Sequence, residues 1–155
     1  MRGGKIFVRD DTGYRAGIHM KAYEEKKPVL VIGGKAGSFL GEYQPGGIII
    51  VLGLNEENRP PVGRFCGTGM HGGKIYLRCD TLPEDLPEQV LASEATPEDQ
   101  RSHRGVLHRV FLFNGQNYGE KILCTGAKQQ KSLQTALHLQ LKCYMMKPEK
   151  GGCML

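Results

Sequence analysis

The stretch 62-VGRFCGTGMHGGKIYL-77 spaces glycines closely around one cysteine and one histidine and ends in an apolar run. A phosphate-binding loop, a nucleophile or metal site, and a bend of a repeated structure all use such a composition. Glycine is also dense around this stretch, since 16 of the 22 glycines lie in the first 73 residues. Each glycine costs about 0.5–1 kcal/mol in regular structure, so this density requires a geometric reason.

The glycines belong to a repeat. The three copies read "VRDDTGYRAGIHMKAY" from Val8, "VIGGKAGSFLGEYQPGG" from Val31 and "VLGLNEENRPPVGRFCGTGMHGG" from Val51. Each contains a Gly-x-x-x-Gly pair, and successive pairs are 24 and 26 residues apart. The glycines at repeat positions are Gly13, Gly17, Gly37, Gly41, Gly46, Gly47, Gly63, Gly67, Gly69, Gly72 and Gly73. A repeat of this kind explains them without a ligand.

Short β-branched runs at 29–32, 48–52 and 74–77 follow or precede these bends, with no helical pattern between them. Parallel strands joined by a crossover usually need a helix of about a dozen residues between them, and the repeat leaves no room for one. The repeat therefore predicts a mainly β solenoid whose turns stack strand on strand, with glycines at the corners for positive φ and close approach. An antiparallel meander or sandwich is the alternative.

The run "VGRFCGTGMHGGKIYLR" (62–78), preceded by "GGIIIVLG" (46–53), resembles the C-terminal GXGXG domain of the glutamate synthase large subunit. The formylmethanofuran dehydrogenase C subunit shares that domain. The resemblance covers residues 3–80, extends loosely through 82–100 and is absent from 124–155. It implies a single-stranded right-handed parallel β-helix with a structural, non-catalytic role.

In that family an amidotransferase domain hydrolyses glutamine, a synthase domain carrying FMN and an iron–sulfur cluster uses the ammonia, and the β-helix braces both. The resemblance thus implies a structural subunit of a split glutamate synthase. Its partners would be the amidotransferase and the FMN/iron–sulfur subunit, and it would bind no cofactor itself. A scaffold subunit of a formylmethanofuran dehydrogenase-like complex is the alternative, and a free-standing enzyme is the third hypothesis.

We expect residues 1–80 to form the β-helix and residues 81–155 to form a linker and a helical C-terminal segment. Thr96, followed by proline and acidic residues, is typical of a helix N-cap. The apolar stripe Val106, Leu107, Val110 and Phe111 continues that helix, Asn114 and Gly115 would end it, and a second helix is predicted at 131–146. The segment would cap one end or side of the solenoid or serve as a partner-binding arm.

Cys66 and His71 are the best nucleophile-and-base pair in the sequence, and they are the residues of the free-standing enzyme hypothesis. They have no third group to orient them, and their spacing with Cys79 fits no common zinc pattern. The stretch also lacks the lysine and hydroxyl of a P-loop. We therefore expect no catalytic, cofactor-binding or metal site, and surface positions for His19 and for His103, His108 and His138.

The composition favours a cytoplasmic protein. The net charge of +5 comes without a basic run, so nucleic acid is not an expected partner. No apolar stretch is long enough to span a membrane, and the start "MRGGKIFVRDD" is not a secretory signal. The five cysteines show no C-x-x-C spacing, which fits a reducing compartment. The oligomeric state stays open, a homo-oligomer included.

Overall fold

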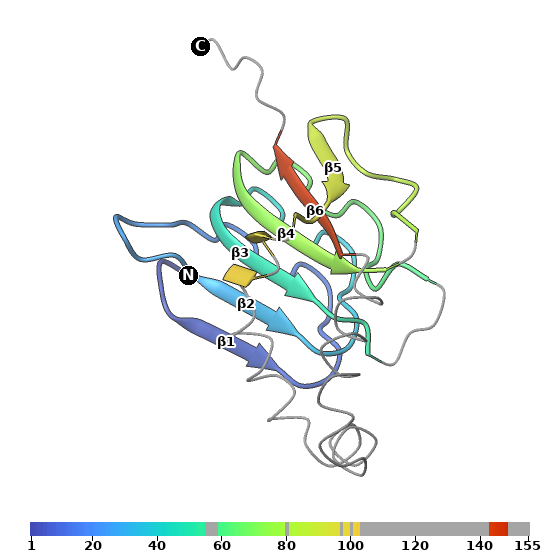
Figure 1. The fold of residues 1–155 in the computed structure, drawn as a ribbon, viewed down its shortest axis with the longest axis horizontal. Helices are drawn as coiled ribbons and strands as arrows, with labels where there is room; N and C mark the ends of the chain where they lie inside the picture. Colours follow the sequence, from blue (N-terminus) through green and yellow to red (C-terminus); the bar gives the residue numbers. More distant parts are fainter. Residues whose placement is uncertain (55–58, 80, 97, 100, 103–142, 149–155) are drawn as a thin grey trace.

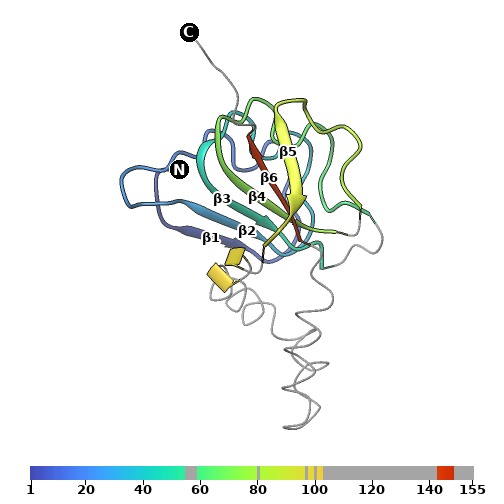
Figure 2. The same cartoon turned by 45° about the horizontal axis from the view of Figure 1, so that its top comes forward.

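The computed structural model describes residues 1–54, 59–79, 81–96, 98–99, 101–102 and 143–148. These residues form one six-stranded sheet with the strand order β1-β2-β3-β4-β6-β5 (Figures 1 and 2). The strands are β1 (Lys5–Val8), β2 (Val29–Ile32), β3 (Pro45–Val51), β4 (Gly72–Arg78), β5 (Val90–Glu94) and β6 (Cys143–Pro148). The protein is thus mainly β, as the sequence predicts.

Strands β1 to β4 are parallel and in register: Lys5 lies beside Val29, Val29 beside Ile48, and Ile48 beside Lys74. The antiparallel alternative is therefore wrong for this part of the sheet. The chain is divided into units at the aligned residues Lys5, Val29, Ile48 and Lys74, so that the glycine pair at the start of β3 and of β4 is counted with the bend before it. Unit 1 is residues 5–28, unit 2 is 29–47 and unit 3 is 48–73. Unit 1 is longer than unit 2, and it contains a short antiparallel bridge between Tyr23 and Lys26.

The two faces of the sheet are both buried by apolar side chains. One face carries the main core, in which Leu30, Ile49 and Ile75 from three successive strands pack against bend residues such as Met20 and Leu40. The other face carries a second cluster of Val29, Val31, Ile50, Leu52 and Tyr76. Burial on both faces explains why β2 and β3 read as continuous apolar runs rather than alternating ones.

The chain after residue 80 returns to the same sheet. β6 pairs antiparallel with β4, and β5 pairs antiparallel with β6. The predicted division at residue 80 therefore does not coincide with an end of the sheet, although the division into 1–80 and 81–155 remains a prediction. The end of the sheet at β4 is covered by a strand, where the sequence suggested a helical cap.

Helix is almost absent from the described residues. Residues 98–99 and 101–102 are helical, and Thr96 caps this turn as predicted: the Asp99 N–H donates to Thr96 Oγ1 (3.2 Å) and the Thr96 hydroxyl donates to Asp99 Oδ2 (2.6 Å). The continuation of the helix to residue 115 lies outside the described residues.

The helix predicted at 131–146 is wrong for residues 143–146, which belong to β6, and its first part lies outside the described residues. β6 forms ladder hydrogen bonds with β4 on one side and β5 on the other. These bonds come from segments distant in sequence, so a local helical pattern could not reveal them.

Candidate functional site: the stacked glycine bends

The bends of units 1, 2 and 3 are joined by backbone hydrogen bonds at equivalent residues. The Arg15 N–H donates to the Ser38 carbonyl (2.9 Å), and the Phe39 N–H donates to the Arg64 carbonyl (2.9 Å). Farther along the bends, the Tyr43 N–H donates to Thr68 (2.8 Å) in the same way. The units therefore stack in register along their bends as well as along their strands.

Positive φ recurs at every second residue of each bend, and the middle residue of each triplet is always glycine. The triplets are Arg15, Gly17 and His19; Phe39, Gly41 and Tyr43; and Phe65, Gly67 and Gly69. The middle position faces the core: a Cβ on Gly41 would lie 2.7 Å from Ile75 Cδ1. At the flanking positions of unit 2, Phe39 is only partly buried and Tyr43 is exposed, so side chains that face solvent accept the strained backbone there.

A second set of glycines lies where one unit's backbone approaches the preceding unit. A Cβ on Gly37 would lie 2.8 Å from the Gly13 carbonyl carbon, and one on Gly63 would lie 2.6 Å from the Ser38 amide nitrogen. Gly46 and Gly72 face Ala22 and Pro45 in the same manner, while Gly47 and Gly73 have positive φ. Gly13 alone among the repeat glycines has neither a positive φ nor any atom within 4 Å of its Cβ position.

The structure adds a glycine pair that the sequence reasoning missed. Gly3 and Gly4 precede β1 as Gly46–Gly47 precede the apolar run of β3, and Gly4 has the positive φ (76°) of Gly47 (86°) and Gly73 (80°). The signal was available, because the string GGKI occurs at residues 3–6 and again at 72–75.

The outward side chains of the bends form an aromatic ladder on the surface. Ring centroids lie 5.3 Å apart between Tyr14 and Phe39 and 5.0 Å apart between Phe39 and Phe65. The Arg15 guanidinium lies over the Phe39 ring (5.1 Å) and also pairs with the buried Glu42 carboxylate (3.1 Å). Such ring pairs contribute about 0.5–1.5 kcal/mol beyond their buried area, which offsets part of the cost of positive φ.

Cys66 does not have the environment of a nucleophile. Its side chain is 1 % exposed within the main core. Burial in this apolar setting, and to a smaller degree the negative charge of Asp85, raises the pKa of the Cys66 thiol well above its usual range. Since the thiolate is the reactive form, this pKa disfavours nucleophilic chemistry at neutral pH. His71, its predicted partner, is exposed.

The remaining candidate ligands give no metal site within the described residues. Cys79 is buried, and no group of three or more His, Cys, Asp or Glu side chains that could hold a metal ion occurs in that part of the chain. His19 is exposed, as predicted, and stacks on Tyr43 with centroids 5.5 Å apart. His103, His108 and His138 lie outside the described residues.

Asp99 binds the segment after β5 to the face of the sheet that carries the second apolar cluster. Its Oδ1 accepts hydrogen bonds from Lys74 Nζ and from the Tyr76 hydroxyl, each at 2.8 Å. Burial of the carboxyl raises the pKa of Asp99, but the hydrogen bonds from Lys74, Thr96 and Tyr76 outweigh that effect, and the pKa lies below its usual range. Asp99 is therefore held as a carboxylate between the chain after β5 and strand β4.

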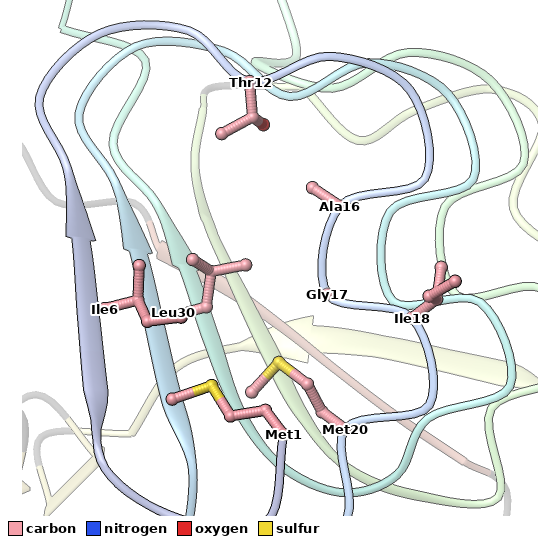
Figure 3. Close-up of a pocket in the computed structure, with 8 residues that line it drawn as sticks. All are labelled: Met1, Ile6, Thr12, Ala16, Gly17, Ile18, Met20 and Leu30. Atoms are coloured by element: carbon pink, nitrogen blue, oxygen red, sulfur yellow. The ribbon is translucent and has the colours of Figure 1, made fainter.

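At the opposite end of the sheet, an apolar groove of about 310 Å³ opens beside β1. Figure 3 shows Ile6 and Leu30 on the strands facing Ala16 and Gly17 on the bend of unit 1. The residues that line it are Met1, Ile6, Thr12, Ala16, Gly17, Ile18, Met20 and Leu30.

The chain belongs to the GXGXG motif family, because a model of that family matches residues 1–135, which include all three stacked bends. Over 92 residues the chain is 56% identical to an uncharacterized protein of Methanocaldococcus jannaschii. The alignment covers 57% of this chain and 35% of that protein. Over 88 residues it is 35% identical to ferredoxin-dependent glutamate synthase 2 of Synechocystis, covering 57% of this chain and 5% of that protein.

The chain thus spans about a third of the first of these relatives and about a twentieth of the second. Among the described residues, no helix is long and apolar enough to cross a membrane.

Proposed function

We propose that this chain is a non-catalytic structural subunit of a split glutamate synthase, bridging the glutamine amidotransferase and the FMN/iron–sulfur synthase subunit in the cytoplasm. The observation that carries the proposal is the sequence similarity to a segment of a ferredoxin-dependent glutamate synthase, within a family match over residues 1–135. The chain would supply the part of the enzyme that holds the two catalytic parts together.

The architecture supports a bracing role. Three units stack through their strands and their bends, and we propose that they are turns of a right-handed parallel β-helix. A stack whose units contact only the units close to them along the stack is a stiff support whose sides stay available for partners. The exposed aromatic side chains of Tyr14, Tyr43 and Phe65 are of the types enriched at protein interfaces.

The chemistry of the bends supports a role without catalysis. The bend glycines are accounted for by core packing and by close approach of neighbouring units, and Cys66 is buried with a raised pKa. We accordingly place the flavin and the iron–sulfur cluster on the synthase subunit rather than on this chain. In the alternative proposal, the chain would be the scaffold subunit of a formylmethanofuran dehydrogenase-like complex and would bind other partners.

Co-expression of this chain with the amidotransferase and synthase subunits encoded in the same genome tests the proposal. We expect the three chains to co-purify, and glutamine-dependent glutamate synthesis to require this chain. A Gly41→Val variant, which should not fold, provides the negative control. Association with neither subunit, with unchanged glutamine-dependent activity in its absence, would refute the proposal, and association with molybdenum- or tungsten-enzyme subunits would favour the alternative.

A further inference from the structure

Among the described residues, the end of the sheet at β1 is apolar and carries no further strand. β1 is the last strand in the described order, and the groove beside it is lined by core-facing side chains that remain partly exposed. Ile6 is 49% exposed, Ile18 is 41% exposed and Met1 is 38% exposed. At the other end of the parallel strands, the corresponding Ile75 is fully buried.

The contacts between inner units follow a rule that can be extended to this end. A Cβ on Gly17 would meet Leu30 (3.3 Å) and Ile49 (2.6 Å), which come from the next two strands. A Cβ on Gly41 would meet Ile49 (3.2 Å) and Ile75 (2.7 Å), again from the next two strands. Side chains from two successive strands therefore pack together against the middle glycine of the bend that precedes both strands.

If the same rule holds one strand earlier, Ile6 and Leu30 would pack against the middle glycine of a bend that precedes β1. In the part of the chain that the structure describes, no unit precedes β1 to supply such a glycine, and these two side chains form one wall of the groove in Figure 3. The groove is thus continuous with the interface that already joins units 1, 2 and 3.

Gly13 gives an independent observation. At the equivalent positions, Gly37 and Gly63 are needed because the preceding unit's backbone lies within 3 Å of their Cβ positions. Gly13 has no atom within 4 Å and no positive φ, so nothing in the described chain requires a glycine there. A preceding unit at the β1 end would bring its backbone close to Gly13, and this close approach would require a glycine at that position.

We propose that the β1 end binds one further strand-and-bend unit with glycine at the middle of its bend, supplied by a partner polypeptide. The strand of that unit would add to β1 in parallel register, direct an apolar side chain onto Ile6 and bring its bend against Gly13. The inference goes beyond the proposed function in naming this surface, and it rests on that function only for the existence of a partner chain.

The test uses the full chain and, as the probe, a synthetic peptide that copies residues 29–43 of unit 2. Residues 44–47 are left out because they correspond in register to residues 1–4, which the chain itself already places before β1. Amide chemical shifts of the isotope-labelled chain are followed while the peptide is added up to about 2 mM, a range that detects weak binding. We expect saturable shifts confined to β1 and the bend of unit 1. A peptide carrying Gly41→Val should cause none, because its valine would collide with the Ile6–Leu30 wall.

Two variants of the full chain complete the design. Gly13→Ala should weaken peptide binding about tenfold or more without lowering the melting temperature, because its methyl group occupies the space through which the docking unit approaches. Glu88→Ala, an exposed position beside β5, is the matched control and should bind as the unmodified chain does.

The inference would be overturned by no binding at the highest concentration, by equal binding by Gly13→Ala, or by shifts confined to β5 and β6. A dimer in sedimentation that Gly13→Ala abolishes would also overturn it, since the occupant would then be a second copy. If the peptide does not bind but the three-chain assembly forms, only the docking surface is wrong. If the peptide binds and the assembly does not form, the proposed function fails and the surface stands.

Discussion

The two ends of the parallel sheet differ, although the same repeat builds both. At the β4 end, β6 completes the ladder, Val90 packs over Gly67 (3.2 Å from its Cβ position) and Asp99 fastens the following chain to Lys74. At the β1 end, none of the described strands pairs with the outer edge of β1, and a groove of about 310 Å³ lies beside it.

The sequence pattern is nearly identical at the two ends, GGKIFV before and within β1 and GGKIYL at β4. The difference therefore arises from what the chain places beside each strand. Open strand edges are sites of pairing with other chains, so the β1 end is the natural place for a partner and the β4 end is not.

The largest expected effect concerns the interior of the stack, which both ends share. Gly41→Val would force a β-branched residue into positive φ (65°) and drive a Cβ to 2.7 Å from Ile75. We expect a loss of about 2–5 kcal/mol in the free energy of unfolding, or failure to fold, from backbone strain and overpacking. Urea unfolding measures it. A variant with native stability would mean that the units do not stack as described.

The next prediction compares an inner unit with the open end. Gly37→Ala should cost about 1–3 kcal/mol, because its methyl group would meet the Gly13 backbone at 2.8 Å. Gly13→Ala should be neutral or stabilise by up to about 1 kcal/mol, because it only restricts the unfolded chain. Thermal unfolding of both variants gives the contrast. Equal destabilisation by the two would show that the β1 end is already occupied.

A smaller effect on stability is expected at the β4 end of the parallel strands, where Asp99 holds the chain that follows β5. The folded-state pKa of Asp99 is lowered relative to an unfolded value of about 3.9, so its stabilisation is present above that pH and is lost as the pH falls. We expect Asp99→Asn to cost about 1–2 kcal/mol at neutral pH, the lower part of that range reflecting screening of the partly exposed Lys74.

The measurement is the free energy of unfolding between about pH 7 and pH 2, over which the difference between the variant and the unmodified chain should shrink. Lys74→Gln serves as the companion variant, because it keeps a hydrogen-bond donor but removes the charge. A difference that stayed constant with pH would show that the Asp99 carboxylate does not fasten this segment.

The smallest expected effect concerns Cys66, for which we expect no alkylation in the folded chain. In the folded chain at about pH 8, Cys66 should resist alkylation, because its thiol is buried and its pKa is raised. Peptide mapping by mass spectrometry, with the urea-unfolded chain as the reactive reference, measures the modification of this residue. Rapid modification of Cys66 in the folded state would reopen the hypothesis of a free-standing enzyme with Cys66 and His71.

Several structural features could be predicted from the sequence because they depend on short-range pattern. The runs predicted at 29–32, 48–52 and 74–77 are strands except for Leu52, which follows the end of β3, and the Gly-x-x-x-Gly spacing correctly indicated equivalent bends. The cap at Thr96 was likewise readable, since a capping residue and its partner lie three positions apart. The repeat also explained the glycines around Cys66 without a ligand.

The different tasks of the glycines could not be read from the repeat. Gly13 and Gly17 look alike in sequence, yet only Gly17 faces the core with positive φ. Which glycine is needed for conformation and which for close approach depends on the neighbouring unit, and that neighbour is a tertiary contact.

The sequence by itself determined the apolar strands of the repeat, the period of the bends and the family of the chain, because these follow from residue types at fixed short spacings. Only the tertiary structure decided that residues 143–146 are strand and that Cys66 lies in the core. It also decided that, among the described residues, a strand pairs beside β4 and none pairs with the outer edge of β1. Each of these depends on contacts between residues tens of positions apart, whose hydrogen bonds and buried surface no local pattern records.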